Sequence, residues 1–215
     1  METAEGGPRE LPIVGGDLAL DFANTVDDPE GPARHDHLES YADLVAWAHR
    51  VDAVPQASVQ PLAALAERDA SGARETVAAA HALRDALNDV FGSLALRPDT
   101  PVDALAGWPV VRDAASLAMG SASLTCPDHG VLPLRWSWSF DAELRSPLHP
   151  VAVAATDLLV SPRLTRLKRC ARCPWLFLDS SRNHSRRWCD MDDCGRAEKI
   201  ERYVARRAAR RATQR

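Results

Sequence analysis

Four cysteines near the C-terminus constrain the fold of this chain more than any other feature. They form two close pairs, Cys170-x2-Cys173 and Cys189-x4-Cys194, with 15 residues between the pairs. Two such pairs supply the four thiolates of a tetrahedral zinc site, and a Cys-x-x-Cys turn can direct both sulfurs at one ion. Because four protein ligands close the coordination sphere, we expect one structural Zn²⁺ and not a catalytic one.

Three other uses of these cysteines are weaker. A redox Cys-x-x-Cys pair would not need the second pair. Two disulfides do not suit the reducing cytoplasm, where we expect the chain because residues 1–10 are polar and lack the apolar core of a signal peptide. An iron–sulfur cluster is an alternative that the same four thiolates would satisfy. Zinc is favoured, and so small a segment should depend on its metal to fold.

The residues around the cysteines predict the arrangement of this zinc-binding segment. Residues 175–179 are strand-like, 180–184 turn-like, and 185–188 can return as a second strand. The second pair then lies at the start of the last helix, near Gly195. Knuckle, hairpin and helix in this order predict a treble-clef-like zinc finger over residues 162–213.

Residues 11–161 predict a mostly helical domain, so the fold class is mainly α with a small β-hairpin. Alternating residues over 123–139, around a turn at 127–130, predict the hairpin, and Ser161-Pro162 marks the domain boundary. Apolar periodicity and capping residues predict one helix from Leu18, capped by Asp17, and a second over 41–51, capped by Ser40. Further helices are predicted over 59–70, with Pro61 in the first turn, and over 73–96, 101–118 and 147–159.

The charge is divided unevenly along the chain. Residues 162–215 hold 16 Lys and Arg against 6 Asp and Glu, whereas residues 1–161 hold 10 against 24. The small net charge of −4 therefore hides a basic C-terminal segment on an acidic body. Such a division indicates either two modules with different partners or two modules that pack on each other.

An arginine-rich helix over 195–213 carries much of the basic charge. On a helical wheel its basic residues gather on one side, and Ala197, Ile200, Val204 and Ala208 gather on the other, where we expect them to pack. Clustered arginine beside a zinc-organised helix favours contact with nucleic acid through phosphates. The candidate contacts are Lys199, Arg202, Arg206 and Arg210 on the helix, and Arg182, His184, Arg186 and Arg187 around the finger turn.

Other interpretations of the basic residues stay open. Zinc with four thiolates has a formal charge of about −2, which nearby arginines could compensate, and others could pair with the acidic domain. Asn183 and Ser185 are expected to be turn residues, not base readers. Trp175 and Trp188 are expected to form the small core of the finger.

Several motifs resemble one known family. Residues 169–179 (RCARCPWLFLD), 181–183 (SRN) and 186–191 (RRWCDM) resemble the CGNR zinc-finger proteins. Residues 15–25 (GGDLALDFANT) are similar to the opening of the ABATE domain that precedes the finger in that family. One motif departs: the family's Cys-Gly-Asn-Arg is Cys194-Gly195-Arg196-Ala197 here, as if the asparagine were deleted. The resemblance implies a transcription regulator of bacterial type, induced by stress.

Two functions follow as hypotheses. The first is a DNA-binding regulator whose N-terminal domain senses a small ligand or forms a homodimer. The second is a zinc-finger adaptor that binds proteins and no nucleic acid. We do not expect an enzyme, since we find no phosphate-binding glycine loop and no Ser-His-Asp signature, and we expect no membrane span because no apolar run approaches 18 residues.

A few residues could be read as further sites, with a plainer interpretation beside each. His35 and His37 with Asp36 could hold a metal but are expected to be loop residues. Asp17, Asp21 and Asn24 could line a pocket, or cap and hydrogen-bond a helix. Cys126 and His129 are half of a metal site at most, and a free thiol is favoured.

Overall fold

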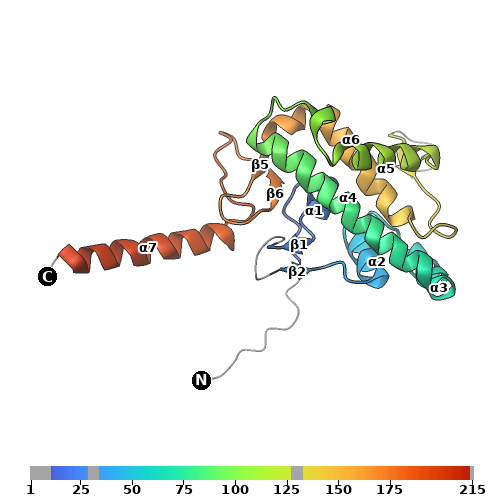
Figure 1. Ribbon diagram of the computed structural model, residues 1–215, viewed down its shortest axis with the longest axis horizontal. Helices are drawn as coiled ribbons and strands as arrows, with labels where there is room; N and C mark the ends of the chain where they lie inside the picture. Colours follow the sequence, from blue (N-terminus) through green and yellow to red (C-terminus); the bar gives the residue numbers. More distant parts are fainter. Residues whose placement is uncertain (1–10, 29–33, 127–132, 214–215) are drawn as a thin grey trace, which may run out of the picture.

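One long helix, α4 (Ala70–Leu96), organises the body of the computed structural model, which describes residues 11–28, 34–126 and 133–213. It crosses the whole body in Figure 1. Its 27 residues span about 40 Å. The Asp69 carboxylate caps it by accepting from the Gly72 N–H at 2.9 Å, and the helix ends two residues before Pro98. The helix predicted over 73–96 is confirmed, with three more residues at its start.

Helices α1 (Leu18–Ala23) and α5 (Trp108–Gly120) pack against α4, and α6 (His149–Val160) packs against both α1 and α5 to complete the core. Asp17 caps α1 as predicted, by accepting from the Ala19 N–H at 3.2 Å. Gly107, at the start of α5, lets that helix approach α4 closely, because a Cβ there would lie 2.6 Å from the Ala86 carbonyl oxygen. The predicted helix over 147–159 is α6, preceded by the 3₁₀ turn η2 (Ser146–Leu148).

Helices α2 (Tyr41–Arg50) and α3 (Gln56–Arg68) cover one end of α4. Ser40 caps α2 as predicted, and the Asp43 carboxylate accepts in return from the Ser40 N–H at 2.8 Å. The predicted start of α3 is wrong, because the helix begins three residues before residue 59 and Pro61 lies inside it. The segment predicted as a helix over 101–118 is a short 3₁₀ turn, η1 (Val102–Ala104), followed by α5.

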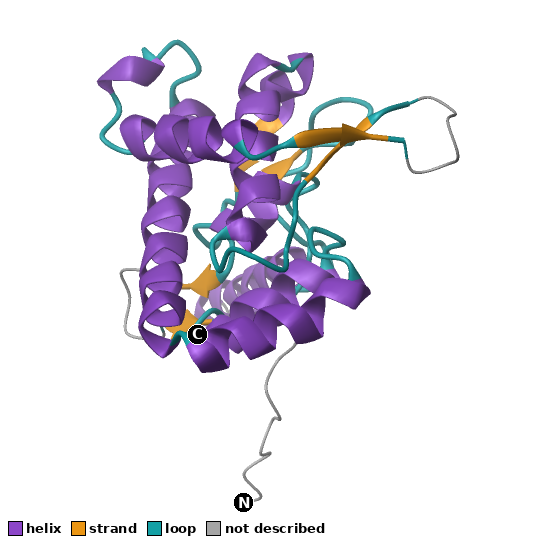
Figure 2. Cartoon of the chain, turned by 90° about the vertical axis from the view of Figure 1, so that its right-hand side faces the viewer, coloured by secondary structure: helices purple, strands orange, loops and turns teal. Residues whose placement is uncertain are grey.

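Among the described residues, three antiparallel two-stranded pairs accompany the helices. The predicted hairpin is β3 (Ser123–Thr125) with β4 (Arg135–Ser137), an exposed ribbon that projects from the helices in Figure 2; its predicted turn at 127–130 is outside the described residues. A second pair is β1 (Val26–Asp27) with β2 (His35–Asp36), so His35 and Asp36, which were expected to be loop residues, lie in a short strand. The third is β5 (Leu167–Arg169) with β6 (Leu176–Leu178), which follows η3 (Pro162–Arg166).

The pairing of β6 corrects the arrangement predicted for the finger. Strand β6 pairs with β5, which precedes the first cysteine pair, so the knuckle is the turn of this hairpin. Residues 185–188 form no strand, although the Arg187 carbonyl accepts from the Ala171 N–H at 2.9 Å. The hairpin packs against α1 and α4 and buries Leu176 and Phe177 in the same core as the helices.

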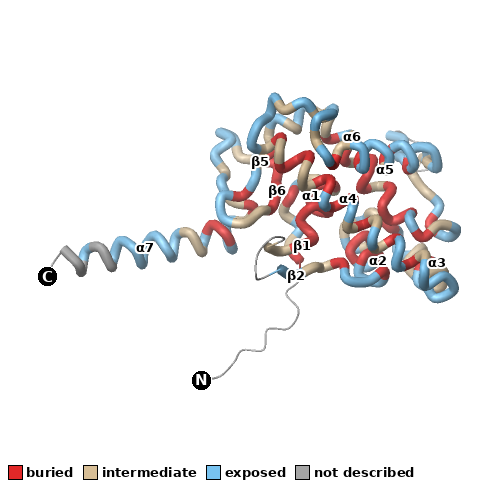
Figure 3. Tube along the Cα trace, in the orientation of Figure 1, coloured by how far each residue is buried: buried red, intermediate tan, exposed pale blue. Residues whose placement is uncertain are grey.

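The last helix, α7 (Cys194–Thr213), leaves the body after its first turn (Figure 1). Figure 3 shows it exposed along most of its described length. The prediction that its apolar side packs is wrong: Ile200 is 54% and Val204 58% exposed, because the body does not extend alongside the helix. In the described part of the chain, we find no helix that is both long and apolar enough to span a membrane.

Candidate metal centre

Three parts of the finger bring the four cysteines together. Cys170 and Cys173 lie in the turn between β5 and β6, which is closed by a 2.8 Å hydrogen bond from the Cys170 N–H to the Trp175 carbonyl. Cys189 lies in the loop after β6, and Cys194 is the first residue of α7. The metal centre therefore joins the hairpin that packs on the body to the helix that leaves it.

The sulfur positions fit a tetrahedral zinc ion. All four Sγ atoms lie within 4.8 Å of one another, with Cys173 to Cys189 at 3.5 Å and Cys189 to Cys194 at 3.8 Å. Zn–S bonds of about 2.3 Å in a tetrahedron place sulfurs about 3.8 Å apart. Among the described residues, these cysteines are the one group of three or more potential metal ligands that converges in this way. No other protein side chain is needed to complete the coordination of zinc.

The protonation of the thiols explains why this cluster suits a cation. Hydrogen bonding to Cys170 raises the pKa of Cys173 to about 12 and also raises the pKa of Cys189. Hydrogen bonds from its neighbours lower the pKa of the Cys170 thiol. Without a metal, one thiolate is thus stabilised by protons held on the others. A zinc ion would replace those protons and stabilise all four thiolates at once.

The loop between β6 and Cys189 is held by a buried carboxylate. Asp179 accepts from the Lys168 ammonium at 2.6 Å, the Ser181 N–H at 2.9 Å and the Arg186 N–H at 3.0 Å. Burial alone would raise the pKa of Asp179, but these hydrogen bonds outweigh it and lower the pKa well below its usual range. The carboxylate therefore stays ionised and fixes the path of the chain toward the second cysteine pair.

Arg186 belongs to this scaffold as well as to the predicted basic surface. Its guanidinium donates to the carbonyls of Trp188 and Cys189 and lies 4.7 Å from the centre of the Phe177 ring. These contacts hold the backbone of a metal ligand. The Arg186 guanidinium therefore donates hydrogen bonds to carbonyls inside the finger. This structural role was not predicted from the sequence.

The N-terminus of α7 forms backbone hydrogen bonds without the asparagine of the family motif. The Gly195 N–H donates to the Asp190 carbonyl and the Ala197 N–H to the Asp193 carbonyl, each at 2.9 Å. The Asp190 carboxylate also accepts from the Asp192 N–H at 2.7 Å. Two of the first backbone donors of the helix, Gly195 and Ala197, thus find acceptors in residues 190–193 without that asparagine.

The body contacts the finger through the segment at residues 15–25. Asn24 donates to the Leu176 carbonyl and accepts from the Leu176 N–H, both at 2.8 Å, and is 1% exposed. The Gly15 carbonyl accepts from the Leu178 N–H at 2.8 Å, and the Trp175 indole donates to the Val26 carbonyl at 3.1 Å. Residues on both sides of α1 therefore hydrogen-bond to the finger hairpin, Gly15 before the helix and Asn24 and Val26 after it.

Glycine and aspartate shape this segment. A Cβ on Gly15 would lie 2.9 Å from the Asp21 backbone nitrogen, and Gly16 has a φ of +74°. The Asp21 carboxylate accepts from the Gly15 N–H at 2.7 Å, and its burial raises its pKa to about 6. The capping and hydrogen-bonding interpretation of Asp17, Asp21 and Asn24 is thus the one the structure supports.

One ion pair links the first knuckle to α7. Arg172 and Glu201 form two hydrogen bonds of 2.8 Å each, and the partnership lowers the pKa of Glu201. The pair bridges a residue between the first two ligands and a residue of the helix seven positions after the last ligand. It restrains the direction of α7 relative to the hairpin, and its residues were not among those predicted from the sequence.

The predicted nucleic-acid contacts fall into two exposed groups. Arg182, His184 and Arg187 lie in the loop before Cys189, where His184 has a φ of +50° in a turn. The second group lies along α7 and comprises Lys199, Arg202, Arg206 and Arg210. Tyr203, which the sequence prediction omitted, is 63% exposed and lies between two of these basic residues along the helix.

The remaining candidate sites have structural roles or are untested. Asp36 forms two hydrogen bonds with the buried guanidinium of Arg84, at 2.6 and 2.7 Å, and so belongs to an ion pair. His37 lies 3.1 Å from Asp27. Cys126 follows β3, but His129 lies outside the described residues, so their pairing is not tested.

Comparison with known families agrees with the arrangement above. Residues 16–162 match the model of the ABATE family, described as a "putative stress-induced transcription regulator". Residues 166–207 match the CGNR zinc finger and include all four cysteines, which form the site of one structural zinc. A search of curated proteins found no match. The chain belongs to the ABATE family and carries a C-terminal CGNR zinc finger.

Proposed function

We propose that this protein is a zinc-dependent transcription regulator that binds duplex DNA through the basic side of α7. The observation that carries the proposal is the exposure of that helix together with the order of its charges. Both acidic residues of α7, Glu198 and Glu201, precede Arg202, and every charged residue from Arg202 to the end of the helix is an arginine. The far half of the helix is therefore a uniformly cationic rod.

Such a rod suits the geometry of DNA. An α-helix fits the major groove, which is about 12 Å wide, and arginines on its sides can reach phosphates of both strands. The 20 residues of α7 extend about 30 Å from the metal centre. Arg182, His184 and Arg187 would contact the backbone beside the groove, and Tyr203 would lie against a sugar or phosphate.

The N-terminal domain is the sensor or dimerisation module in this proposal. Because β6 shares its core with α1 and α4, a change in the packing of those helices would reach the metal centre directly. The assignment of regulation also follows the description of the ABATE family. The role involves binding and no catalytic step.

The test is the fluorescence anisotropy of a labelled duplex over a series of salt concentrations. We expect affinity to fall steeply with salt, and replacing both Arg202 and Arg206 with alanine to reduce the slope of log K against log salt by about 2, or about 1 for each phosphate contact. Replacing Arg68 and Arg97, two exposed arginines of the body, changes the net charge equally and should leave the slope unchanged. Equal slopes for the two double variants would show that Arg202 and Arg206 of α7 do not contact the duplex.

A second candidate is a protein adaptor, and the exposed Ile200 and Val204 favour it. Uncovered apolar side chains beside basic ones can dock on an amphipathic, acidic partner surface. Affinity purification with and without nuclease distinguishes the two functions. Partners that persist after nuclease treatment and are lost in an Ile200→Ser, Val204→Ser variant support the adaptor, whereas partners lost with nuclease support DNA binding.

A further inference from the structure

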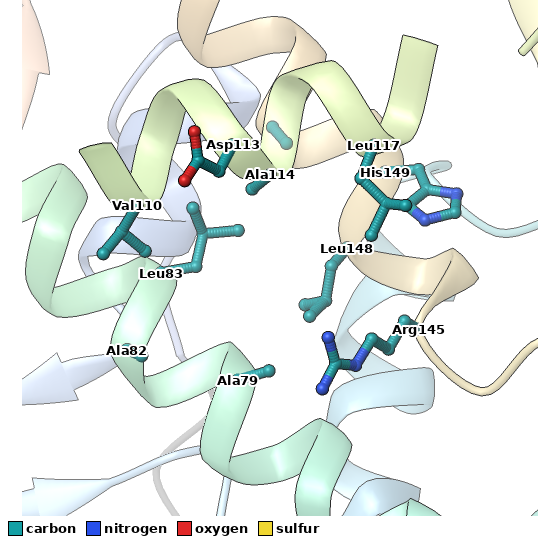
Figure 4. A pocket seen from close by; sticks show the side chains of 11 residues that line it. Ala79, Ala82, Leu83, Val110, Asp113, Ala114, Leu117, Arg145, Leu148 and His149 are labelled. Carbon is teal, nitrogen blue, oxygen red and sulfur yellow. The ribbon is translucent and has the colours of Figure 1, made fainter. Parts of the chain in front are cut away.

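A cavity of about 280 Å³ lies between α4, α5 and α6, on the side of the body formed by the ABATE domain. This volume lies just below the range of about 300–1,000 Å³ that is typical of small-molecule sites, so the cavity has room only for a small ligand. Its walls are mostly apolar, with Leu83 from α4, Val110 and Leu117 from α5, and Leu148 from the turn before α6. Figure 4 shows these side chains around an open centre.

One cation lies at the edge of this apolar space, on an exposed residue. The guanidinium of Arg145 points from the turn before α6 toward the centre of the cavity, facing Ala79 of α4 (Figure 4). Within the described residues, the Arg145 guanidinium forms no ion pair and no hydrogen bond. Asp113 on the opposite wall is paired with its neighbour Arg112 at 2.8 Å.

A buried histidine adds a second polar group to the wall. His149 is 3% exposed, and its Nε2 has no hydrogen-bond partner among the described residues. The nearest carboxylate oxygen, on Glu143, is 3.9 Å away, beyond hydrogen-bond reach. Its Nδ1 lies 3.4 Å from the Ser121 hydroxyl, and Figure 4 draws the ring beyond Leu117 from the open centre, so the case for a ligand rests on Arg145 and the apolar walls.

We propose that this cavity binds a small, largely apolar carboxylic acid. The carboxylate would pair with the Arg145 guanidinium, which can form two parallel hydrogen bonds with it, and the apolar part would fill the space lined by Leu83, Leu117 and Leu148. The choice of an anion rests on charge complementarity, since Arg145 is the cation of the lining without a partner in the described chain. This inference deepens the sensor role proposed above and gives it a ligand class.

The test is isothermal titration of the full-length, zinc-loaded protein with four probes: hexanoate, benzoate, phenylacetate and indole-acetate. We expect at least one acid to bind with a Kd below about 1 mM. The alcohol and the amine that correspond to the tightest acid should bind at least about tenfold more weakly. Because no DNA is present, failure here leaves the proposed DNA binding untouched.

Two variants test the charge of Arg145 and the volume of the cavity separately. Arg145→Gln removes the cation from an exposed residue without a partner, so the fold should persist, and binding of the acid should weaken at least about tenfold. Ala114→Leu fills the cavity from α5 and should abolish binding, with circular dichroism checking the fold. The proposal is overturned if none of the four acids binds, if Arg145→Gln binds the acid as tightly as the wild type, or if the alcohol binds as tightly as the acid.

Discussion

The carboxamide of Asn24 forms two hydrogen bonds with the backbone of Leu176, a residue 152 positions away. Both bonds are buried, and they lie between the start of the ABATE domain and the strand that follows the first cysteine pair. The zinc finger is therefore not a separate unit joined to the body by a linker alone. Its hairpin is built into the core of the helical domain, and the metal joins that core to α7.

The first prediction concerns this link. Replacing Asn24 with alanine should lower the free energy of unfolding by about 2–4 kcal/mol, because it leaves the N–H and the carbonyl of Leu176 buried without partners. Urea denaturation of the zinc-loaded protein measures the change. Asn183→Ala, in the exposed finger turn, is the matched control and should change stability by less than about 0.5 kcal/mol. Equal effects of the two substitutions would contradict the proposed link.

The second prediction concerns Asp21 and pH. Burial raises the pKa of Asp21 to about 6, so the folded state holds this proton more tightly than the unfolded state does. The contribution to stability is complete below about pH 4 and is lost as the pH rises through about 6, by about 2–3 kcal/mol in total.

Asp21→Asn keeps an oxygen for the Gly15 N–H and removes the titration. The free energy of unfolding of the variant, relative to that of the wild type, should therefore rise by about 2–3 kcal/mol between about pH 4 and about pH 7. Urea denaturation of both proteins over this range measures the difference, in which the protonation of zinc ligands and histidines cancels. A difference independent of pH would show that Asp21 has an ordinary pKa.

The third prediction concerns the ion pair of Arg84 and Asp36. Burial would raise the pKa of Asp36, but the hydrogen bonds from Arg84 outweigh it and lower the pKa to about 2. Arg84→Met should cost about 3–5 kcal/mol, since Asp36 loses its two shortest hydrogen bonds and, among basic side chains, keeps only the longer contacts with Arg34 at 3.4 Å and His81 at 3.7 Å. The stability that this pair supplies is present above about pH 4 and lost as the pH falls through about 2, so the cost should shrink in acid.

Two further variants check the origin of that cost. Changing Asp36 to leucine together with Arg84→Met should restore much of the stability, because no unpaired charge is left. Arg112→Met breaks a surface pair with Asp113 and should cost less than about 1 kcal/mol. Thermal unfolding of the wild type and the three variants at neutral pH measures these costs. If Arg84→Met alone destabilises the protein no more than Arg112→Met does, the pair of Arg84 and Asp36 does not behave as a buried ion pair.

Features set by neighbouring residues could be predicted from the sequence. The caps at Asp17 and Ser40, the long helix α4 and the cysteine cluster all depend on local spacing. The position of α3 was missed because Pro61 is tolerated inside an exposed helix, where local rules place proline in the first turn. The hairpin of the finger was predicted with the wrong partner, since alternation marks a strand but does not say which strand it pairs with.

Contacts between distant parts of the chain were beyond such reasoning. The Asn24 carboxamide and the Arg84 guanidinium find partners that no spacing rule identifies, and α7 was expected to pack because its apolar side repeats at helical intervals. That periodicity shows which side is apolar but does not show whether another surface covers it.

The fourth prediction concerns the direction of α7. Glu201→Ala breaks the ion pair with Arg172, whereas Glu198→Ala removes the same charge one turn earlier and breaks only a contact within the helix. Backbone ¹⁵N relaxation should show greater motion of α7 in Glu201→Ala alone. Stability should change by at most about 1 kcal/mol in either variant, as expected of exposed pairs. Equal mobility in both would show that the pair does not restrain the helix.

The central claim is that one zinc ion, bound by Cys170, Cys173, Cys189 and Cys194, joins α7 to the core. Native mass spectrometry with elemental analysis of the purified full-length protein tests it most directly. The account predicts about one zinc per chain in the wild type and its loss when Cys189 is replaced by serine. A wild-type protein with no metal or with iron, or a Cys189→Ser variant that retains zinc fully, would contradict it.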